Sequence, residues 1–419
     1  MRKIFLSLVF VLVIFLDLGG RNIFAESDDE REEVISPKAR KIVVFRPGVN
    51  IEEKNAVLKK YGVKIRKHFS LVNATAVVLP DELGKAEAEI LRDSRVERIE
   101  EDIEFTALPT EVLRNRRFVL PSKRPPSQPT QTIPWGISRI KAPDAWALST
   151  GRGIDVAILD TGIQLDHPDL QANIKGGINI INPRKTPNDD NGHGTHVAGI
   201  VGAIDNGIGV VGVAPQANLY AVKVLNAAGS GWLSDIIEGL EWCINTGMDV
   251  VNMSFGASSD SDIFHETIIN AYNSGIVLVA AAGNEGGPVL YPAAYEEVIA
   301  VAASDNNDQI PSWSNSGPEM DLTAPGVNIY STYKGSTYKT LSGTSMASPH
   351  VAGTVALVLT RPLTLKLPDG TNKNYDLNGN SRWDPAEVKL RLEDTAESLS
   401  GYNDNQQGKG LVRADRAVQ

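Results

Sequence analysis

The sequence has a single cysteine, Cys243, so an intramolecular disulfide bond is impossible. Basic residues are also in deficit, because 41 Lys and Arg stand against 51 Asp and Glu and leave a formal net charge of −10. An acidic chain lacks the positive surface that binds nucleic acids and anionic membranes, so we expect no nucleic-acid partner. If the protein is exported, its stability must come from its core or from bound ions.

Long apolar runs are absent after the N-terminal segment, so no other part of the chain is a candidate for a membrane span of about 20 residues. The content of 42% hydrophobic and 22% charged residues is ordinary for globular proteins and excludes wholesale disorder. A length of 419 residues predicts two or three domains.

The N-terminus predicts export. After a short basic start (MRK), residues 4–18 form an almost unbroken apolar run, which is followed by Gly19-Gly20 and then by Phe24-Ala25-Glu26. This is the organisation of a signal peptide, which we assign to residues 1–25 with cleavage after Ala25. An uncleaved membrane anchor stays open as an alternative, because Asp17 interrupts the run and Ile23 fits the −3 position poorly.

Residues 26–108 predict a small α+β domain. Its pattern, after a charged stretch, is strand 41–45, helix 50–61, strands 63–70 and 72–79, helix 81–94 and a last strand 95–105. The order βαββαβ indicates a ferredoxin-like sandwich. Residues 109–131 then form a Pro- and Arg-rich stretch, which we interpret as an exposed linker of the kind that proteases cut.

Residues 132–419 predict a large α/β domain. Short apolar runs are bounded by Gly, Asn and Asp at 154–159, 219–224, 250–253, 276–281 and 298–302, and helix-like stretches such as 232–245 and 263–274 lie between them. Strands that alternate with helices predict a parallel sheet with helices on both faces. In such sheets the functional residues lie at the carboxyl ends of the strands.

Two polar residues stand out in this domain. Asp160 ends the apolar run VAILD, where a carboxylate is costly unless its charge is used, although a turn-forming Asp-Thr-Gly would also fit. His193 lies in NDDNGHGTHVAG, between glycines that allow close approach of the backbone. His193 and His196 are three residues apart, but the chain has no HExxH motif and no further ligands nearby, so we do not expect a zinc site.

Ser345, in LSGTSMASPHVAG, completes a possible catalytic set. The glycine predicts a tight turn, after which a helix begins at or near the serine, and the positive end of a helix stabilises a developing anion. A serine hydroxyl is a poor nucleophile at neutral pH and needs a base. His193 can accept its proton, and Asp160 can hold the imidazole tautomer and stabilise the imidazolium.

These motifs resemble a known family. VAILDTGI, NGHGTHVAG and GTSMASPHVAG are similar to the three active-site signatures of subtilisin-like serine proteases, the peptidase S8 family, in the same order. The resemblance covers roughly residues 131–419. It implies a serine endopeptidase on a subtilisin-like parallel sheet flanked by helices, with Asp160, His193 and Ser345 as catalytic residues. A non-catalytic binding protein and a stand-alone inhibitor are the competing classes, but no triad residue is lost and the protease is attached.

The resemblance also implies an oxyanion donor and a substrate channel. Asn284, in AAGNEG, supplies a side-chain amide beside the backbone N–H of Ser345. The implied substrate-binding residues are Ser230, Gly231, Ser254, Phe255, Gly256, Ala281, Ala282, Gly283 and Leu290. A peptide that adds as a strand between two backbone edges is read mainly through its main chain, which implies broad sequence tolerance.

Two features concern the S1 pocket, which holds the residue before the cleaved bond (P1). The family usually has a cis-proline in the segment Tyr291-Pro292-Ala293. Leu290 stands where the family usually has Gly at the floor of this pocket, so we expect a large aromatic P1 residue to fit poorly.

For residues 26–108 the resemblance implies an inhibitory propeptide of the I9 type, which acts as an intramolecular chaperone and inhibitor. Its last strand, RIEEDIEFTAL, should lead the chain into the active site. The linker is longer than in the simplest family members. We expect the first processing cut near Leu108, although Pro109 is an awkward P1′ residue, and a second cut in the Arg-rich linker is plausible.

Calcium is the implied substitute for disulfide bonds. Residues 204–210 resemble the family's high-affinity calcium loop. The implied ligands are the side chains of Gln131, Asp169 and Asn206 with the carbonyls of Ile204, Ile208 and Val210. An all-oxygen shell suits Ca²⁺, whereas a glycine turn without metal is the alternative.

An insertion around residues 364–387 predicts a second calcium site. Oxygen side chains at positions 1, 3, 5, 9 and 12 and a carbonyl at position 7 follow the spacing of an EF-hand loop; they belong to Asp376, Asn378, Asn380, Asp384, Glu387 and Arg382. Position 6 is Ser381, where the EF-hand has Gly. A polar surface insertion is the alternative interpretation. The loop should lead into a helix over residues 385–395, whose first turn would supply Glu387.

Together, these features predict a secreted, extracellular serine endopeptidase of the subtilisin type, stabilised by Ca²⁺ and made as a self-processing zymogen. Its expected partners are polypeptide substrates and its own propeptide, and we expect a monomer.

Overall fold

The computed structural model describes residues 39–80, 84–108 and 128–419. The expected signal peptide and most of the expected linker lie outside these residues. The chain divides into residues 1–35 and 36–419, and only the second unit contains described residues. Within the described residues, no helix has the length and apolar character that crossing a membrane would require.

A four-stranded antiparallel sheet with two helices forms the N-terminal part of this unit. Its elements are β1 (Arg40–Phe45), α1 (Ile51–Lys60), β2 (Lys64–His68), β3 (Ala74–Val78), α2 (Lys85–Ile90) and β4 (Val96–Glu101). The strands lie in the order β2-β3-β1-β4, which confirms the expected βαββαβ arrangement. Helix α1 starts at a capping box in which the side chains of Asn50 and Glu53 each accept the other's backbone N–H.

The single last strand expected over residues 95–105 is wrong. The chain forms two strands in this stretch. The first, β4, ends at Glu101, and the short strand β5 (Glu104–Ala107) joins a different sheet, between β9 (Ser230–Trp232) and β11 (Phe255–Gly256). Asp102 lies at the break, where its buried carboxylate accepts the backbone N–H of Ser234 at 2.8 Å. A carboxylate at the N-terminus of a helix is stabilised there, and this contact takes the chain out of the first sheet.

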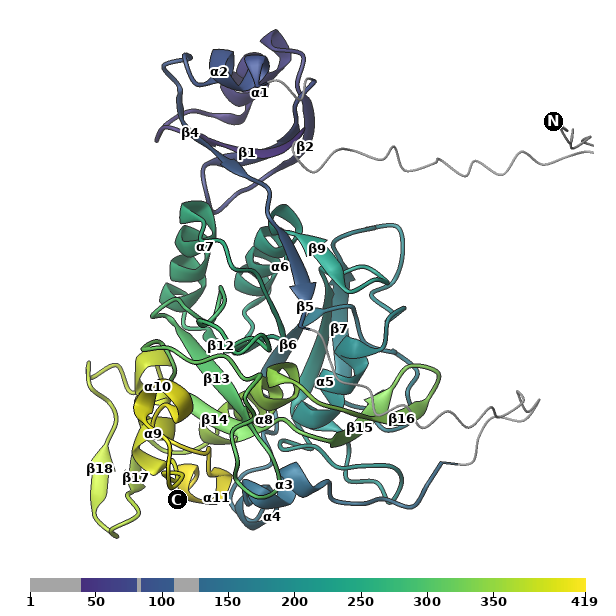
Figure 1. Ribbon diagram of the computed structural model, residues 1–419, viewed down its shortest axis with the longest axis vertical. Helices are drawn as coiled ribbons and strands as arrows, with labels where there is room; N and C mark the ends of the chain where they lie inside the picture. Colours follow the sequence, from purple (N-terminus) through teal and green to yellow (C-terminus); the bar gives the residue numbers. More distant parts are fainter. Residues whose placement is uncertain (1–38, 81–83, 109–127) are drawn as a thin grey trace, which may run out of the picture. The chain divides into compact units, whose positions relative to one another are not determined.

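The expected parallel sheet is confirmed as the centre of the large domain (Figure 1). Seven parallel strands lie in the order β14-β13-β12-β10-β6-β8-β7; they are β6 (Asp155–Asp160), β7 (Ile174–Asn179), β8 (Asn218–Lys223), β10 (Val250–Met253), β12 (Val277–Ala281), β13 (Val298–Ser304) and β14 (Leu322–Pro325). The two faces carry different helices. Helices α5 (His193–Gly202) and α8 (Thr344–Val358) pack with one core cluster, and α6 (Leu233–Thr246) and α7 (Asp262–Asn273) with the other.

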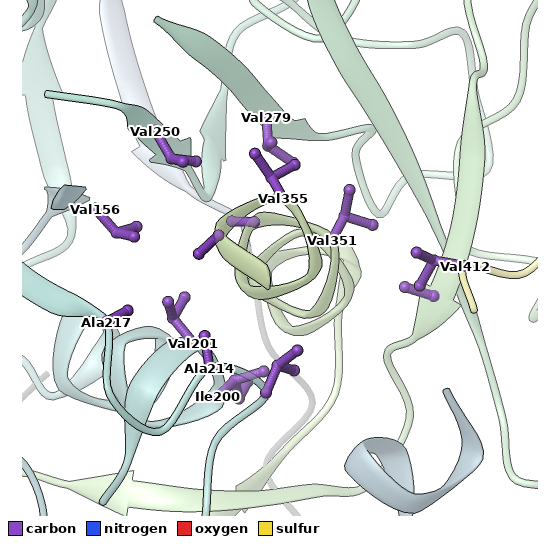
Figure 2. Packing of buried hydrophobic residues seen from close by; sticks show 14 of the residues in the cluster. Val156, Ile200, Val201, Ala214, Ala217, Val250, Val279, Val351, Val355 and Val412 are labelled. Atoms are coloured by element: carbon purple, nitrogen blue, oxygen red, sulfur yellow. The ribbon is translucent and has the colours of Figure 1, made fainter. Parts of the chain in front are cut away.

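Alternation along the strands builds both cores. In β6, Val156 and Ile158 belong to the cluster of α5 and α8, whereas Ala157 and Leu159 belong to the cluster of α6 and α7. All 15 residues of α8 are buried. Figure 2 shows Val351 and Val355 of this helix among side chains from the neighbouring strands and from α5. A helix that is buried on every side presents its first residues from a fixed position.

The remaining elements complete the domain: α3 (Trp135–Arg139), α4 (Ala142–Ala145), β15 (Ile329–Tyr333), β16 (Thr337–Leu341), β17 (Thr364–Lys366), β18 (Asn372–Asn374), α9 (Pro385–Thr395), α10 (Asp404–Gln407) and α11 (Ala414–Ala417). The insertion expected after α8 consists of the β17–β18 hairpin and a loop that leads into α9. The bounds of α9 agree with those expected from the sequence.

Candidate active site

Three elements bring Asp160, His193 and Ser345 to one edge of the sheet. Asp160 is the last residue of β6, His193 is the first residue of α5, and Ser345 is the second residue of α8. All three side chains are buried. The carboxyl end of a parallel strand and the N-termini of two helices thus present an acid, an imidazole and a hydroxyl.

Asp160 and His193 are directly hydrogen bonded. Nδ1 of His193 lies 2.9 Å from each carboxylate oxygen of Asp160, and the backbone N–H of Thr161 donates to Asp160 Oδ1 at 2.7 Å. Burial alone would lower the pKa of His193, but the adjacent Asp160 charge outweighs it, so the pKa is raised. The carboxylate accepts a hydrogen bond from Nδ1–H of His193, so the proton of the neutral imidazole stays on Nδ1 and Nε2 is the acceptor.

The hydroxyl of Ser345 points to a different partner. Its Oγ donates to the carbonyl oxygen of Ser254 at 2.9 Å, while His193 Nε2 is buried and has no hydrogen-bond partner within the described chain. The Ser–His hydrogen bond of a Ser-His-Asp arrangement is therefore not formed in this conformation. Catalytic hydrogen bonds are often long or poorly aligned without substrate and tighten only when substrate binds.

The side chain of Asn284 is held by the residue before the serine. Its Oδ1 accepts both the backbone N–H and the hydroxyl of Thr344, each at 2.9 Å. The same hydroxyl accepts the backbone N–H of Gly283 at 3.1 Å. Because these bonds fix the amide oxygen, the amide nitrogen of Asn284 faces the other way, at the turn before α8.

Strand β5 occupies the channel expected to bind peptides. Phe105 and Thr106 pair with Gly231 and Ser230 on one side, and Thr106 and Ala107 pair with Gly256 and Phe255 on the other, all antiparallel. A side chain at Gly231 would place its Cβ 2.2 Å from the carbonyl oxygen of Val224, so only glycine fits this edge. Ser254 lies outside this ladder and contacts Ser345 instead.

The residue after β5, Leu108, is buried beside Leu290. A Cβ built on Gly256 would lie 3.1 Å from Leu290 Cδ1 and 3.4 Å from Leu108 Cδ2, so these residues meet at one point. The backbone of Leu290 donates to the carbonyl of Ala282 at 2.9 Å, beside buried Ala281 and Gly283. Leu290 therefore borders the space that holds Leu108. The expected cis peptide between Tyr291 and Pro292 is confirmed.

Three residues before Leu108, Phe105 fills an aromatic pocket. Its ring packs edge-on against Phe255 and Phe264, with centroids 5.9 Å and 5.3 Å away. Phe105 is fully buried. Edge-on aromatic pairs add about 0.5–1.5 kcal/mol beyond the apolar area that they bury, so Phe105 anchors the strand in the channel.

Comparison with known proteins identifies the family. The model of the subtilase family matches residues 151–410. Subtilisin E of Bacillus subtilis (strain 168) is 38% identical over 428 aligned residues, which cover 100% of this chain and 99% of the relative. Subtilisin Savinase of Lederbergia lenta is 47% identical over 290 residues, covering 69% of this chain and 99% of the relative. M-protease of Shouchella clausii (strain KSM-K16) is 43% identical over 347 residues, covering 82% and 80%.

The chain belongs to the subtilase family. This subtilase is accordingly a serine endopeptidase. The match to the family model contains the segments that carry the Asp, His and Ser motifs.

The first candidate calcium set of this subtilase surrounds a buried carboxylate. Oδ2 of Asp169 accepts the backbone N–H of Val210 at 2.9 Å, whereas Oδ1 is buried and has no hydrogen-bond partner among the described residues. Burial raises the pKa of Asp169 to about 6. Oε1 of Gln131 accepts two N–H groups of the 204–210 loop, those of Asn206 and Gly207. An unpaired buried carboxylate oxygen beside this loop fits a bound cation.

The second candidate set lies in the inserted loop. Asp384 Oδ2 accepts the side-chain amides of Asn378 and Asn380, and the carboxylate of Asp376 accepts the backbone N–H of Ser381. Glu387 is buried and accepts the backbone N–H groups of Leu377 and Asp384. Ser381, at the position of the EF-hand glycine, has a positive φ of 62°, the conformation that glycine favours there. Within the described chain, no three acidic, His or Cys side chains converge in a geometry that would hold a metal.

Several residues of the site were not anticipated from the sequence. Thr344 orients Asn284, and Phe264 lines the aromatic pocket. Asp189 and Thr161 bond to the start of α5. The signals were present but weak, since Asp189 stands in the same motif as His193 and Thr161 follows Asp160 directly. The sequence alone does not show which distant backbone group a short polar side chain in a turn will bind.

Proposed function

We propose that this subtilase hydrolyses peptide bonds of proteins through Ser345, His193 and Asp160, with an acyl-enzyme intermediate. The observation that carries the proposal is the buried pair of His193 and Asp160 beside a channel in which an extended strand, β5, is bound on both edges. A nucleophile, a base and a carboxylate that orients the base are the groups that acyl transfer requires.

The three residues have different roles in the reaction. Ser345 turns from the carbonyl of Ser254 towards His193, gives its proton to Nε2 and attacks the carbonyl carbon of the P1 residue. His193 then protonates the leaving nitrogen as the peptide bond breaks, and a water molecule hydrolyses the acyl-enzyme by the same path. Asp160 holds the tautomer with the proton on Nδ1 and stabilises the imidazolium that forms.

Asn284 serves as the oxyanion donor. Its amide oxygen is engaged by Thr344, which favours a nitrogen aimed at the oxygen that becomes negative during attack. The backbone N–H of Ser345, at the N-terminus of α8, is the second donor. A helix buried on all sides keeps this donor fixed, so little reorganisation accompanies the reaction.

The channel binds substrates as β5 is bound. Ser230 and Gly231 form one edge and Phe255 and Gly256 the other, with Ser254 beside the nucleophile. The S1 pocket is bordered by Ala281, Ala282, Gly283 and Leu290, next to the position of Leu108. Because two ladders of main-chain hydrogen bonds supply much of the binding, the enzyme accepts many protein sequences.

The protein is made as a secreted zymogen. Residues 1–25 act as the signal peptide, residues 26–108 as an inhibitory propeptide and folding chaperone, and residues 109–131 as the linker that is cut during maturation. Occupation of the channel by β5 supports inhibition by the attached domain. The released enzyme acts as an extracellular monomer.

Calcium stabilises the folded enzyme. The side chains of Gln131, Asp169 and Asn206 with the carbonyls of Ile204, Ile208 and Val210 would hold one ion, and residues 376–387 a second. A bound Ca²⁺ supplies positive charge to oxygen ligands and no chemistry in peptide hydrolysis. The unpaired Oδ1 of Asp169 supports the first site. In the second, the carboxylates of Asp376, Asp384 and Glu387 would have to draw together around the ion.

A single variant tests the catalytic assignment. Ser345→Ala should leave a full-length precursor that does not process itself and does not react with a fluorophosphonate probe. Ser304→Ala is the control, because this buried hydroxyl has no hydrogen-bond partner in the described chain and lies in β13. It should process and label like the wild type. Autoprocessing of the Ser345→Ala protein at the wild-type rate, with host proteases excluded, would refute the assignment.

A further inference from the structure

The start of helix α5 carries five backbone N–H groups that precede the first bond within the helix. They belong to residues 191–195, and the N–H of His196 is the first to donate along the helix axis, to Gly192. Such groups at a helix start are costly when buried without an acceptor. Four of these five residues are buried, so other acceptors must serve them.

Side chains accept all five N–H groups. Asp189 accepts three of them, from Asn191 at 2.9 Å, Gly192 at 2.8 Å and Thr195 at 2.9 Å. The N–H of His193 donates to the side chain of Asn191 at 3.1 Å. The N–H of Gly194 donates to the hydroxyl of Thr161, which lies outside the turn. The carboxylate of Asp189 is therefore the main acceptor at the point where the chain presents His193.

Thr161 joins this turn to the carboxylate that contacts the imidazole. Its hydroxyl accepts the N–H of Gly194 at 2.9 Å and donates to Asp189 Oδ1 at 2.9 Å, while its backbone N–H donates to Asp160 Oδ1 at 2.7 Å. One residue thus ties Asp160, Asp189 and the first turn of α5 together. Both partners of the Asp160–His193 hydrogen bond depend on the same connection.

The side chain at position 189 has to be a carboxylate. It accepts five hydrogen bonds and donates none, because the hydroxyl of Thr195 also donates to Oδ2, at 2.6 Å. Asparagine has the same shape but would turn an NH₂ group towards groups that are themselves donors. Asp189 is 5% exposed, so water cannot relieve that conflict.

We infer that Asp189 is a positioning residue for peptide hydrolysis, which holds His193 in register with Asp160 and adds a second negative charge beside the imidazole. The inference rests on the proposed role of His193 as the base. Asp189 has no hydrogen bond to β5, β9 or β11 within the described residues, so it acts on the base and not on the bound peptide.

Charges around His193 agree with this role. Asp160 and, more weakly, Asp189 raise the pKa of His193 against the effect of burial. His196, on the same helix, is the nearby imidazole and its pKa is lowered to about 3, so it stays neutral. Lys223 donates to the carbonyl of Thr161 and pairs with Asp190 at 2.7 Å, which balances its charge. Loss of the Asp189 charge therefore lowers the proton affinity of the base.

The test compares Asp189→Asn with Asp190→Asn in the mature enzyme. Asp190 is the neighbouring acid on the same turn, and its side chain is 53% exposed. Within the described residues its carboxylate pairs with Lys223 and accepts no N–H group of α5, so its variant removes the same charge and leaves the acceptors of α5 in place. A variant that does not process itself is matured by immobilised wild-type enzyme, which is then filtered out. For Asp189→Asn we expect kcat to fall about 10- to 100-fold with KM nearly unchanged, because misplacement of a catalytic group by about 1 Å has effects of this size. The acid limb of kcat/KM should move to lower pH.

Thr161 provides a second, gentler test. Thr161→Val removes the bridging hydroxyl and keeps the volume, so it should lower kcat, and Thr161→Ser should restore it. Thermal unfolding of each variant checks that the fold is retained. The inference is overturned if Asp189→Asn keeps its kcat and its acid limb, if Asp190→Asn gives the same changes, or if Thr161→Ser behaves as Thr161→Val. Failure of the proposed function has a different signature, since His193→Ala would then remain active.

Discussion

The S1 pocket offers the sharpest prediction about substrates. The side chain of Leu290 borders the space that holds Leu108, and both approach the point where Gly256 would carry a Cβ, at 3.1 Å and 3.4 Å. A branched residue therefore fits beside Leu290, but a benzyl group that reaches further into the same space meets the Leu290 side chain. We predict that a substrate with Leu at P1 is cleaved faster than the matched Phe substrate. The Leu290→Gly variant should reverse this order.

The size of the reversal follows from the cost of overfilling a packed space. Extra methylenes typically cost about 1–3 kcal/mol, and each 1.4 kcal/mol is a factor of ten, so the ratio of kcat/KM for Phe over Leu should rise about 5- to 150-fold in Leu290→Gly. Leu290→Met is the matched control, because swaps that conserve volume change packing little and should alter the ratio by less than about threefold.

The assay uses two peptides that differ only at P1, both with Phe at the position that Phe105 occupies in β5. Competition between them in one reaction, read by mass spectrometry, gives the ratio of kcat/KM directly and cancels errors in enzyme concentration. A wild-type enzyme that prefers Phe, or a Leu290→Gly variant with an unchanged ratio, would show that Leu290 does not limit the pocket.

Three further predictions concern other parts of the chain. Asp160→Asn should lower kcat by about 10⁴, because the imidazole of His193 is no longer held in the right tautomer. In the wild type, activity is lost at low pH as His193 gains a proton, with a pKa above the ordinary 6.5. Without the Asp160 charge this loss should move to lower pH, which a pH-rate profile measures. Asp376→Ala with Glu387→Ala should bind one Ca²⁺ fewer, and added calcium should lengthen its half-life at high temperature less than it does for the wild type, as measured by metal analysis and by inactivation rates in calcium and in chelator. Pro109→Ala should speed cleavage after Leu108, because proline presents a tertiary nitrogen with no N–H; N-terminal sequencing of the products checks this, and an unchanged site and rate would contradict it.

The parallel sheet could be predicted because its strands have a clear sequence pattern. Runs such as 154–159 and 250–253 are short, apolar and bounded by Gly, Asn or Asp, and helical stretches separate them. Buried parallel strands need apolar side chains on both faces, so little else fits such runs. The start of α9 was also predictable, because Asp384 at the N-cap and Pro385 at the first helical position favour a helix start through local interactions alone.

The candidate site was predictable in its residue types but not in its hydrogen bonds. Asp160 and His193 are hydrogen bonded and Ser345 begins a helix at the same edge of the sheet, yet the Ser345 hydroxyl bonds to Ser254 and not to His193. A hydroxyl rotates between acceptors of similar strength, and that balance depends on what occupies the channel. Sequence reasoning also missed Asp189, because the backbone groups that need a carboxylate become known only once the start of α5 is built.

The break between β4 and β5 shows where local patterns stop being informative. Residues 95–105 carry apolar side chains at positions 96, 99, 103 and 105, and neither Pro nor Gly interrupts the stretch. The cause lies 132 residues away, where the N-terminus of α6 offers the N–H of Ser234 to Asp102. Arg40 also donates to the carboxylate of Asp102 and lies 4.3 Å from the ring centre of Trp232, so a buried charge is paired and the break is held. Because the chain leaves the first sheet at this residue, the four residues of β5, Glu104–Ala107, are free to pair with β9 and β11 and so fill the channel of the large domain.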